Sequence, residues 1–293
     1  MQYVILDLEW NGSYSKKAHG YFNEIIEVGA IKLDENLAVI GEFQEEIHPV
    51  VSKKLSSIVT NLTNITPEEL EDGTTFAKMM KRFARFLGNE PTAVLTWSTT
   101  DLLVLMENCR FFYGRQEVPA VKYYMDFQAY AQQRIKTEDG QQLGLSKAGE
   151  LLSIPQDALS LHRALDDSRL TVHILQKVAD AASLEAAVQT VNEEFYRRIT
   201  YKVTVVSDIH DPLVQRGDFS FVCPQCGEKL KQKTSFRFHN RAFCAEMRCH
   251  ACKKSYIARV QYRRKYEGTE VRRKLTEKVE KPPEPSPKAE TDP

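Results

Sequence analysis

Residues 3–10 read YVILDLEW, an apolar segment that carries two carboxylates, Asp7 and Glu9. Such a run predicts a buried β-strand with a polar interruption. Because side chains alternate along a strand, Asp7 and Glu9 share one face, with Cα atoms about 6.6 Å apart. Two carboxylates at this spacing repel each other unless a cation lies between them. The segment therefore predicts a site for divalent metal ions, against the alternative of two solvated acids on an exposed strand.

The segments that follow predict a mixed sheet covered by helices. Residues 24–34 and 39–49 read as strands joined by a hairpin turn, residues 92–98 as another strand, and residues 121–135 as a short strand that runs into a helix. Hairpins come first and helical crossovers later, which is typical of an α/β fold. Helices are expected at 66–88, 101–114, 144–154, from Ala164 to about Ala182, and at 183–199.

Asp101 opens a predicted helix directly after a predicted strand, with Thr99 or Thr100 as the N-cap. Functional groups of α/β proteins lie at such strand ends, which makes Asp101 a candidate ligand. The alternative is an acid that only stabilises the positive end of the helix dipole.

The segment 161–170 reads LHRALDDSRL and places a histidine ahead of two adjacent aspartates. In a helix that begins near Ala164, Asp167 lies on an apolar stripe that faces the sheet, whereas Asp166 faces water. An inward acid needs a partner because an unpaired buried charge is costly, so Asp167 is the candidate ligand. His162 projects from the preceding loop, where its imidazole can act as a general base; a lone surface histidine is the alternative.

Five of the six cysteines lie between positions 223 and 252, and four of them form two CxxC pairs with 22 residues between the pairs. The paired cysteines are Cys223, Cys226, Cys249 and Cys252. Without a recognisable export signal, clustered cysteines favour metal over disulfides. Four thiolates at this spacing predict a zinc ribbon with a closed, structural Zn²⁺ site. Cys244 is the spare cysteine, and His239 and His250 are alternative ligands.

Charge is divided unevenly along the chain. Residues 229–278 hold 16 Lys or Arg against 4 Asp or Glu, whereas residues 1–228 hold 22 against 32. Aromatic and basic residues alternate around the cysteines, among them Arg237, Phe238 and Arg263. This mixture suits single-stranded nucleic acid, which is bound by charge neutralisation and base stacking. A solvated basic surface, with aromatic residues that form only a small core, is the alternative.

Taken together, these motifs resemble the DEDDh family of 3′→5′ exonucleases over roughly residues 1–180. The shared features are Asp-x-Glu on the first strand, an Asp after a later strand, and His-x4-Asp near the end. The segments 24–34, 47–66 and 144–171 look most like the branch with the Eri-1-type RNA exonucleases and the bacterial sporulation-inhibitor-like exonucleases. The resemblance implies a ribonuclease H-like mixed β-sheet flanked by helices, to which a small C-terminal zinc-ribbon module is added.

The resemblance also implies the roles of individual residues. The residues that would hold two Mg²⁺ or Mn²⁺ ions are Asp7, Glu9, Asp101 and Asp167. His162 would be the general base. Trp10, Asn11 and Leu62 would line the pocket for the 3′-terminal nucleotides, although strand alternation places Trp10 on the core side. One departure from the family is the sequence WSTT ahead of Asp101.

The expected function is a metal-dependent 3′→5′ exonuclease that hydrolyses single-stranded nucleic acid, RNA slightly preferred over DNA, to nucleoside 5′-monophosphates. The alternative is a regulatory interaction protein or a nucleic-acid-binding protein with a vestigial nuclease domain. Its partners would be the 3′ ends of single-stranded RNA or DNA, with no membrane and a cytoplasmic location. The expected parts are an exonuclease domain at 1–182, a connecting region at 183–217, a zinc ribbon at 218–266, and a basic, then Pro-rich and disordered, tail at 267–293.

Overall fold

The structure is a computed structural model that describes residues 1–52, 54–136, 142–157 and 159–278. The chain divides into two compact units, Met1–Thr200 and Tyr201–Pro293. The Pro-rich segment that was predicted to be disordered lies outside the described residues. Among the helices that are described, none is both long and apolar enough to cross a lipid bilayer.

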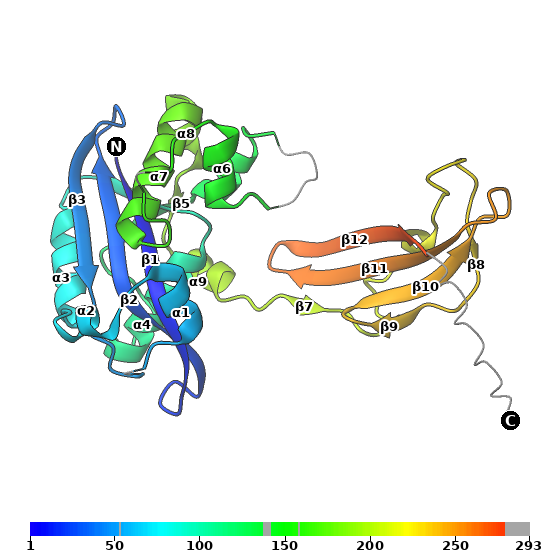
Figure 1. Cartoon of the computed structure of the whole chain (residues 1–293), viewed down its shortest axis with the longest axis horizontal. Coiled ribbons are helices and arrows are strands. Elements are labelled where there is room, and N and C mark those ends of the chain that lie inside the picture. The colour runs from blue at the N-terminus through cyan, green and yellow to red at the C-terminus, as the bar shows by residue number, and fades with distance from the viewer. Residues whose placement is uncertain (53, 137–141, 158, 279–293) are drawn as a thin grey trace, which may run out of the picture. The chain divides into compact units, whose positions relative to one another are not determined.

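The first unit is built on a six-stranded sheet with the order β3-β2-β1-β4-β5-β6 (Figure 1). Its strands are β1 (Gln2–Ser15), β2 (Gly20–Leu33), β3 (Val39–Glu46), β4 (Thr92–Thr96), β5 (Tyr123–Asp126) and β6 (Gln189–Thr190). The first three strands pair antiparallel, as hairpins must. Strand β4 joins β1 in parallel, and β5 joins β4 in parallel, each after a helical crossover. The predicted mixed sheet is confirmed.

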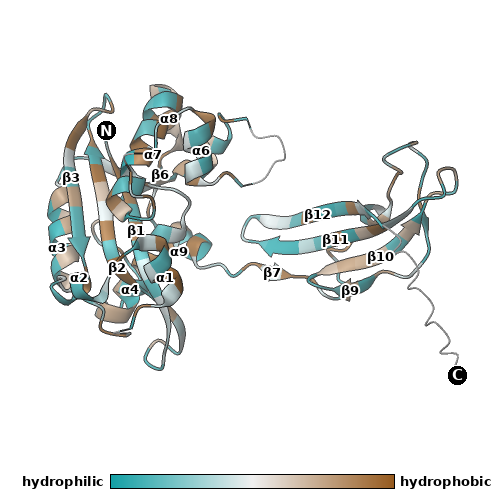
Figure 2. Ribbon diagram, viewed as in Figure 1, coloured by the Kyte–Doolittle hydropathy of each residue, from teal (hydrophilic) through white to brown (hydrophobic). Residues whose placement is uncertain are grey.

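Helices cover both faces of this sheet (Figure 1). They are α1 (Ser57–Thr63), α2 (Pro67–Glu71), α3 (Phe76–Leu87), α4 (Thr100–Tyr113), α5 (Phe127–Gln132), α6 (Leu145–Leu151), α7 (Ala164–Val178), α8 (Ala181–Ala187) and α9 (Glu193–Ile199). One hydrophobic core lies under α3 and α4, and a second lies under α5 and α7. Apolar residues recur along β1 and β2 between these layers (Figure 2).

The alternation of side chains along β1 assigns its residues to the two cores. Leu6 and Leu8 are buried on the α3/α4 side, whereas Tyr3 and Ile5 are buried on the α7 side. Asp7 and Glu9 continue the second set and therefore face the helix layer that contains α7. The central strand β1 thus places two carboxylates on the face of the sheet that α7 covers.

The prediction of a single helix over residues 66–88 is wrong, because this segment forms two helices, α2 and α3. Thr66 caps α2 in a capping box with Glu69. At Thr74, however, the backbone bonds with Glu46 and His48 at the end of β3. This long-range pairing takes precedence over helix propensity, and Thr75 caps the new helix α3.

The helix that contains Asp167 was predicted to continue to about Ala182, but it ends at Val178. Ala179 is extended, and the Asp180 side chain accepts a hydrogen bond from the Ser183 N–H to start α8. The helix predicted at 183–199 is also wrong, because it consists of the end of α8, strand β6 and helix α9. Phe195 of α9 packs into the first core, so residues up to Thr200 belong to the first unit.

A glycine sets how closely α7 approaches the sheet. A Cβ atom at Gly29 of β2 would lie 2.1 Å from the backbone of Ala164 and Leu165. Side-chain carbons do not come so close to backbone atoms, so only glycine lets the start of α7 rest on β2. This contact brings the N-terminus of α7 against the strand next to β1.

The second unit contains a separate six-stranded sheet with a core of its own. Its elements are β7 (Thr204–Val205), the 3-10 helix η1 (Arg216–Phe219), β8 (Lys231–Gln232), β9 (Arg237–His239), β10 (Ala242–Arg248), β11 (Ser255–Lys265) and β12 (Gly268–Glu277). Residues 268–277 were expected in the basic part of the tail, whereas they form β12 and pair with β11 along their whole length.

Candidate metal centre and active site

The end of β4 leaves a place for Asp101 beside β1. The pairing of β1 with β4 ends at Ile5, before the two carboxylates of β1. Beyond this point, the carboxylate of Asp101 accepts the backbone N–H of Leu8 at 3.2 Å. Thr99 is the N-cap residue of α4 and makes no side-chain cap bond. Asp101 is 5% exposed, and the residue to which it bonds, Leu8, lies between Asp7 and Glu9.

Asp167 lies in the first turn of α7, on the buried stripe that the sequence predicted. One of its carboxylate oxygens accepts the backbone N–H of His162 at 3.2 Å. His162 has a φ of +67°, and this left-handed turn folds its backbone toward the helix N-terminus. The neighbouring Asp166 has other partners: it accepts the Ser160 N–H and pairs with Arg169 at 2.7 Å.

The turn before α7 brings three candidate ligands together. Glu9, His162 and Asp167 each offer a ligand atom, and these atoms all lie within 4.8 Å of one another. The His162 side chain is exposed, whereas Asp167 is buried. The three ligand atoms therefore lie where the protein surface meets the interior. Residues separated by more than 150 positions in the sequence thus form one cluster.

The carboxylates of this cluster are held at high electrostatic cost. Burial raises the pKa of Glu9 to about 8, that of Asp101 to about 7 and that of Asp167 to about 6. Burial also raises the pKa of Asp7, and the nearby charges of Asp101, Asp167 and Glu9 raise it further. The ionised form of Asp7 is therefore disfavoured by the three other acids.

Such a set of acids is chemically suited to a divalent cation. Carboxylate oxygens are the ligands that Mg²⁺ and Mn²⁺ prefer, and a positive ion among them would remove the repulsion that raises their pKa values. The charges of Asp101, Asp167 and Glu9 all raise the pKa of Asp7, so the four acids lie near one another and their chemistry fits a shared divalent cation.

A buried ion pair that the sequence did not reveal fixes the start of α7. Glu27 of β2 is fully buried, and its carboxylate accepts hydrogen bonds from the Arg163 guanidinium at 2.8 and 3.0 Å. The other oxygen accepts the Ala164 N–H at 3.0 Å. The Glu27 carboxylate also raises the pKa of Arg163, so this cation stays charged. Glu27 thereby anchors Arg163 and Ala164, the two residues that directly follow His162.

The three residues predicted to line a nucleotide pocket have different surroundings. Trp10 is half-buried and packs against the first core, as strand alternation suggested. Asn11 is buried; its amide donates to the Lys54 carbonyl at 3.2 Å and accepts the Ser56 N–H at 3.1 Å. Asn11 thus holds the segment that begins α1. Leu62 is 47% exposed on that helix.

The four paired cysteines meet in the second unit. Their sulfur atoms all lie within 4.8 Å of one another, with Cys226 and Cys249 at 3.5 Å and Cys223 and Cys252 at 4.0 Å. A tetrahedral zinc site with Zn–S bonds of about 2.3 Å requires sulfur separations of about 3.8 Å, so the arrangement fits a metal ion. The Tyr256 hydroxyl lies 3.4 Å from Cys223 and lowers the pKa of this thiol to about 6.

The alternative zinc ligands lie elsewhere in the second unit. The Cys244 thiol is directed to the carbonyl oxygens of His239 and Ala242 at 3.7 Å. Neither Cys244 nor His239 nor His250 belongs to the metal-ligating group that the described residues form.

The predicted contacts of the ribbon with nucleic acid are spread over its sheet. Arg237 is exposed on β9, and Arg263 of β11 pairs with Glu270 at 3.3 Å. Phe238 is 41% exposed, and its ring meets that of Phe243 edge to face at 5.5 Å. The structure therefore places Phe238 beside the core of the second unit.

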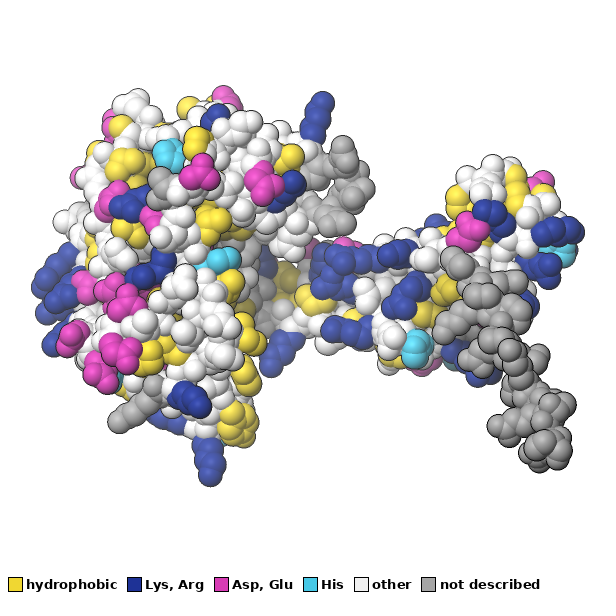
Figure 3. Space-filling model, in the orientation of Figure 1, with side chains coloured by type: hydrophobic (Ala, Val, Ile, Leu, Met, Phe, Trp, Pro, Cys, Tyr) yellow, Lys and Arg dark blue, Asp and Glu magenta, His cyan; other side chains and the backbone are white. Residues whose placement is uncertain are grey.

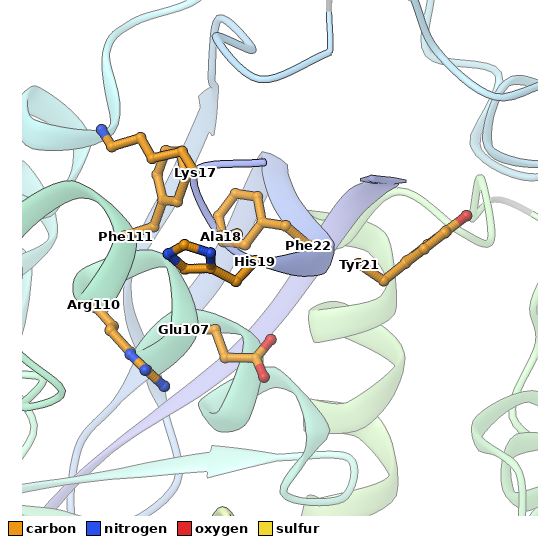
Figure 4. Close-up of a pocket in the computed structure, with 8 residues that line it drawn as sticks. All are labelled: Lys17, Ala18, His19, Tyr21, Phe22, Glu107, Arg110 and Phe111. Atoms are coloured by element: carbon orange, nitrogen blue, oxygen red, sulfur yellow. The ribbon is translucent and has the colours of Figure 1, made fainter. Parts of the chain in front are cut away.

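A pocket of about 330 Å³ lies between the tip of the β1–β2 hairpin and α4 (Figure 4). Phe22 and Phe111 stack in it at 4.5 Å, and the Lys17 ammonium lies 4.6 Å from the centre of the Phe111 ring. The pocket shares no residue with the acidic cluster. Its contacts tie the far end of the long hairpin to α4.

A mixed sheet with helices on both faces, and buried acids gathered over its central strand, define an α/β protein of the ribonuclease H-like class. Residues 4–175 match the RNase_T exonuclease family, and the chain belongs to this family. The predicted membership of an exonuclease family is therefore confirmed, as is the fold.

Solved structures with the same fold include several exonucleases. The nuclease domain of 3′hExo, a DEDDh family member bound to rAMP, superposes with a TM-score of 0.53 at 20% identity, over 65% of this chain and 96% of that one. A full-length 3′-exonuclease superposes with a TM-score of 0.52 at 19% identity, over 66% and 67% of the two chains. Cell-death related nuclease 4 gives 0.51 at 18% identity, over 69% and 72%.

Curated relatives by sequence are much longer proteins. The PolC-type DNA polymerase III of Clostridium perfringens is 26% identical over 205 residues, which are 69% of this chain and 13% of the polymerase. That of Thermotoga petrophila is 25% identical over 188 residues, which are 61% of this chain and 12% of the polymerase. The chain thus spans about an eighth of the length of these relatives.

Proposed function

We propose that the first unit is a metal-dependent 3′→5′ exonuclease that acts on single-stranded nucleic acid and releases nucleoside 5′-monophosphates. The observation that carries this proposal is the convergence of Asp7, Glu9, Asp101 and Asp167, with His162 at the edge of the cluster. Membership of the exonuclease family supports the same reaction class.

The four carboxylates would hold two Mg²⁺ or Mn²⁺ ions. Such ions supply an activated water and stabilise the charge on the attacking and leaving oxygens. The protein's part is to keep the four acids in place before the ions arrive. The Leu8 N–H orients Asp101, and the His162 N–H orients Asp167.

His162 would take a proton from the attacking water on a ring nitrogen. Its side chain is exposed and therefore open to solvent and substrate, while its backbone is fixed by the bond to Asp167. An imidazole exchanges protons near neutral pH, which suits a general base in this reaction.

The 3′-terminal nucleotide would lie against Leu62 and the exposed part of Trp10. Asn11 would act indirectly, because both polar atoms of its amide are used to position α1, which carries Leu62. RNA would be slightly preferred over DNA. In support, the structural relatives include a protein bound to rAMP and one described as recognising the 3′ end of a histone mRNA stem-loop.

The test uses matched single-stranded RNA and DNA of about 20 nucleotides, labelled at the 5′ end, with Mg²⁺, Mn²⁺ or EDTA. The proposal expects a ladder that shortens from the 3′ end in either metal, disappears in EDTA, and forms faster on RNA. Tight binding without any shortening in all three conditions would contradict it and support the alternative of a nucleic-acid-binding protein.

The four clustered cysteines would hold one structural Zn²⁺ ion. We expect one zinc per chain in the wild-type protein, and loss of that zinc with unfolding of the second unit in Cys249→Ser, because folding of a small module depends on its metal. Zinc content by atomic absorption and protease resistance of the second unit measure this. Cys244→Ser is the matched control and should keep its zinc. Equal zinc contents in the two variants would contradict the assignment.

The raised pKa values predict how pH affects the metal-free first unit. The folded state holds protons on Glu9, Asp101 and Asp167 more tightly than the unfolded state. Their contribution to stability is therefore present below about pH 4 and is lost as the pH rises through about 6 to 8. Without divalent ions, the melting temperature should fall between pH 6 and pH 8.

Added Mg²⁺ should raise this melting temperature more at pH 8 than at pH 6, because protons compete with the ion for the carboxylates. Tryptophan fluorescence reports the first unit selectively, since the only tryptophans of the chain are Trp10 and Trp97. A larger effect of Mg²⁺ at pH 6 would show that other groups bind it.

A further inference from the structure

The two faces of the sheet in the second unit have different chemistry. Along β11, Tyr256, Ala258, Val260 and Tyr262 are buried in the core. The residues between them belong to the opposite face, because side chains alternate along a strand. On that outward face β11 carries Arg259 and Arg263, among other residues.

Strand register aligns the cations of neighbouring strands into a row. Arg237 of β9 pairs with Cys244 of β10, Cys244 pairs with Arg259 of β11, and Arg259 pairs with Lys274 of β12. Directly paired residues lie on the same face, so Arg237, Arg259 and Lys274 form one line across four strands. With strands about 4.8 Å apart, the line is about 14 Å long. We call these three residues the cationic row.

The cationic row is not neutralised within the sheet. The nearby acids have other partners: Glu270 pairs with Arg263, Lys265 and Arg272, and Glu246 pairs with Lys233 and Lys278. In the part of the chain that the structure describes, no carboxylate pairs with a member of the row. The Arg259 guanidinium donates to the carbonyl of Asn240. Lys and Arg side chains also gather over the β11–β12 hairpin in the view of Figure 3.

The aromatic residues that were expected to stack on bases belong to the core instead. Phe243, Tyr256 and Tyr262 are each at most 2% exposed. Phe238 pairs with Phe243 across the strands, so it lies on the core face and not beside the row. The outward row therefore offers charge without a stacking platform.

We propose that the cationic row binds the sugar–phosphate backbone of a nucleic acid strand and does not read its bases. Guanidinium and ammonium groups at intervals of one and two strand spacings suit a line of phosphates. Contacts with phosphates carry no direct sequence information, so binding would be tolerant of sequence. This inference rests on the proposed function, in that the strand bound here would be the nuclease substrate; an acidic protein partner is the competing occupant.

The experiment measures binding without turnover, so that its result does not depend on catalysis. The full chain with zinc carries Asp7→Asn, and binding to a fluorescent 30-nucleotide strand is followed by anisotropy without added Mg²⁺ or Mn²⁺ at several salt concentrations. Adding Arg237→Ala, Arg259→Ala and Lys274→Ala together should weaken binding roughly 10- to 100-fold at low salt. The slope of log affinity against log salt should fall by about 2, at roughly 0.7 per phosphate contact for a single strand.

The matched control is Lys78→Ala, Lys81→Ala and Arg85→Ala in the same background. These residues are exposed on α3 of the first unit, and the variant has the same change in net charge. This control variant should bind the strand with the same affinity and salt dependence as Asp7→Asn alone. Zinc content and melting profiles show whether the row variant is folded; if it is not, the single variant Lys274→Ala, on an exposed edge-strand position, replaces it with an expected three- to tenfold loss.

Two results would overturn the inference. One is unchanged affinity and salt slope in the folded row variant, which would leave the row to a protein partner. The other is a loss that appears with oligo(U) but not with oligo(C), which would mean base recognition. If the row variant binds weakly as expected while the wild-type chain never shortens a strand in Mg²⁺ or Mn²⁺, the nuclease proposal fails and the row remains a nucleic-acid surface.

Discussion

Asp7→Asn is expected to lower the rate of 3′ shortening by about 10³-fold or more, with little loss of binding. Asp7 interacts with all three other acids of the cluster, so its replacement removes the charge that both proposed ions would share. The amide keeps the shape of the carboxylate and relieves a buried repulsion, which should leave the fold intact. Single-turnover rates on 5′-labelled RNA in Mg²⁺ measure the effect.

The control for this variant is Asp34→Asn. Asp34 also accepts backbone N–H groups, but it does so in the exposed turn between β2 and β3. Its rate should stay within threefold of wild type. A rate for Asp7→Asn within tenfold of wild type, in a protein that melts normally, would contradict the role given to the acidic cluster.

The second large effect is expected from Glu27→Ala, which should destabilise the first unit by about 3–5 kcal/mol. The substitution leaves the Arg163 guanidinium without its buried partner and the Ala164 N–H without an acceptor. It should also slow shortening, because the turn that holds His162 and the start of α7 both depend on this carboxylate. Urea unfolding followed by tryptophan fluorescence gives the free energy of unfolding.

Glu45→Ala provides a comparison on the neighbouring strand. Glu45 pairs with Arg82 at 2.8 Å, but the arginine side chain is 51% exposed. Removal of such a surface pair should cost less than about 1 kcal/mol. Similar losses in the two variants would show that the Glu27–Arg163 pair does not anchor α7. If Glu27→Gln restores activity but not stability, the role of Glu27 in positioning the His162 turn is distinct from its role in stability.

The features of the fold and the site that could be predicted from sequence are those with a local signature. The apolar strand with two carboxylates, the paired CxxC motifs and the inward stripe of α7 each follow from periodicity or spacing over a few residues. The structure places the predicted acids and His162 in one region because these local elements assemble on a sheet whose order the hairpins and crossovers already limit.

What sequence reasoning missed depends on contacts between distant segments. Glu27 and Arg163 are 136 positions apart, and nothing in the local pattern of either indicates the partner. The break before α3 has its cause in the pairing of Thr74 with the end of β3. Alternation of aromatic and basic residues around the cysteines suggested a mixed surface, but strand register separates the rings from the charges.

The most direct test of the central proposal is a crystal structure of the protein in Mn²⁺, with the ions located by their anomalous scattering. Two peaks about 3.5–4 Å apart are expected among the carboxylates of Asp7, Glu9, Asp101 and Asp167. Both peaks should be lost in Asp7→Asn. No peak in this cluster in the wild-type protein, or peaks only at other surface acids, would contradict the proposed metal site.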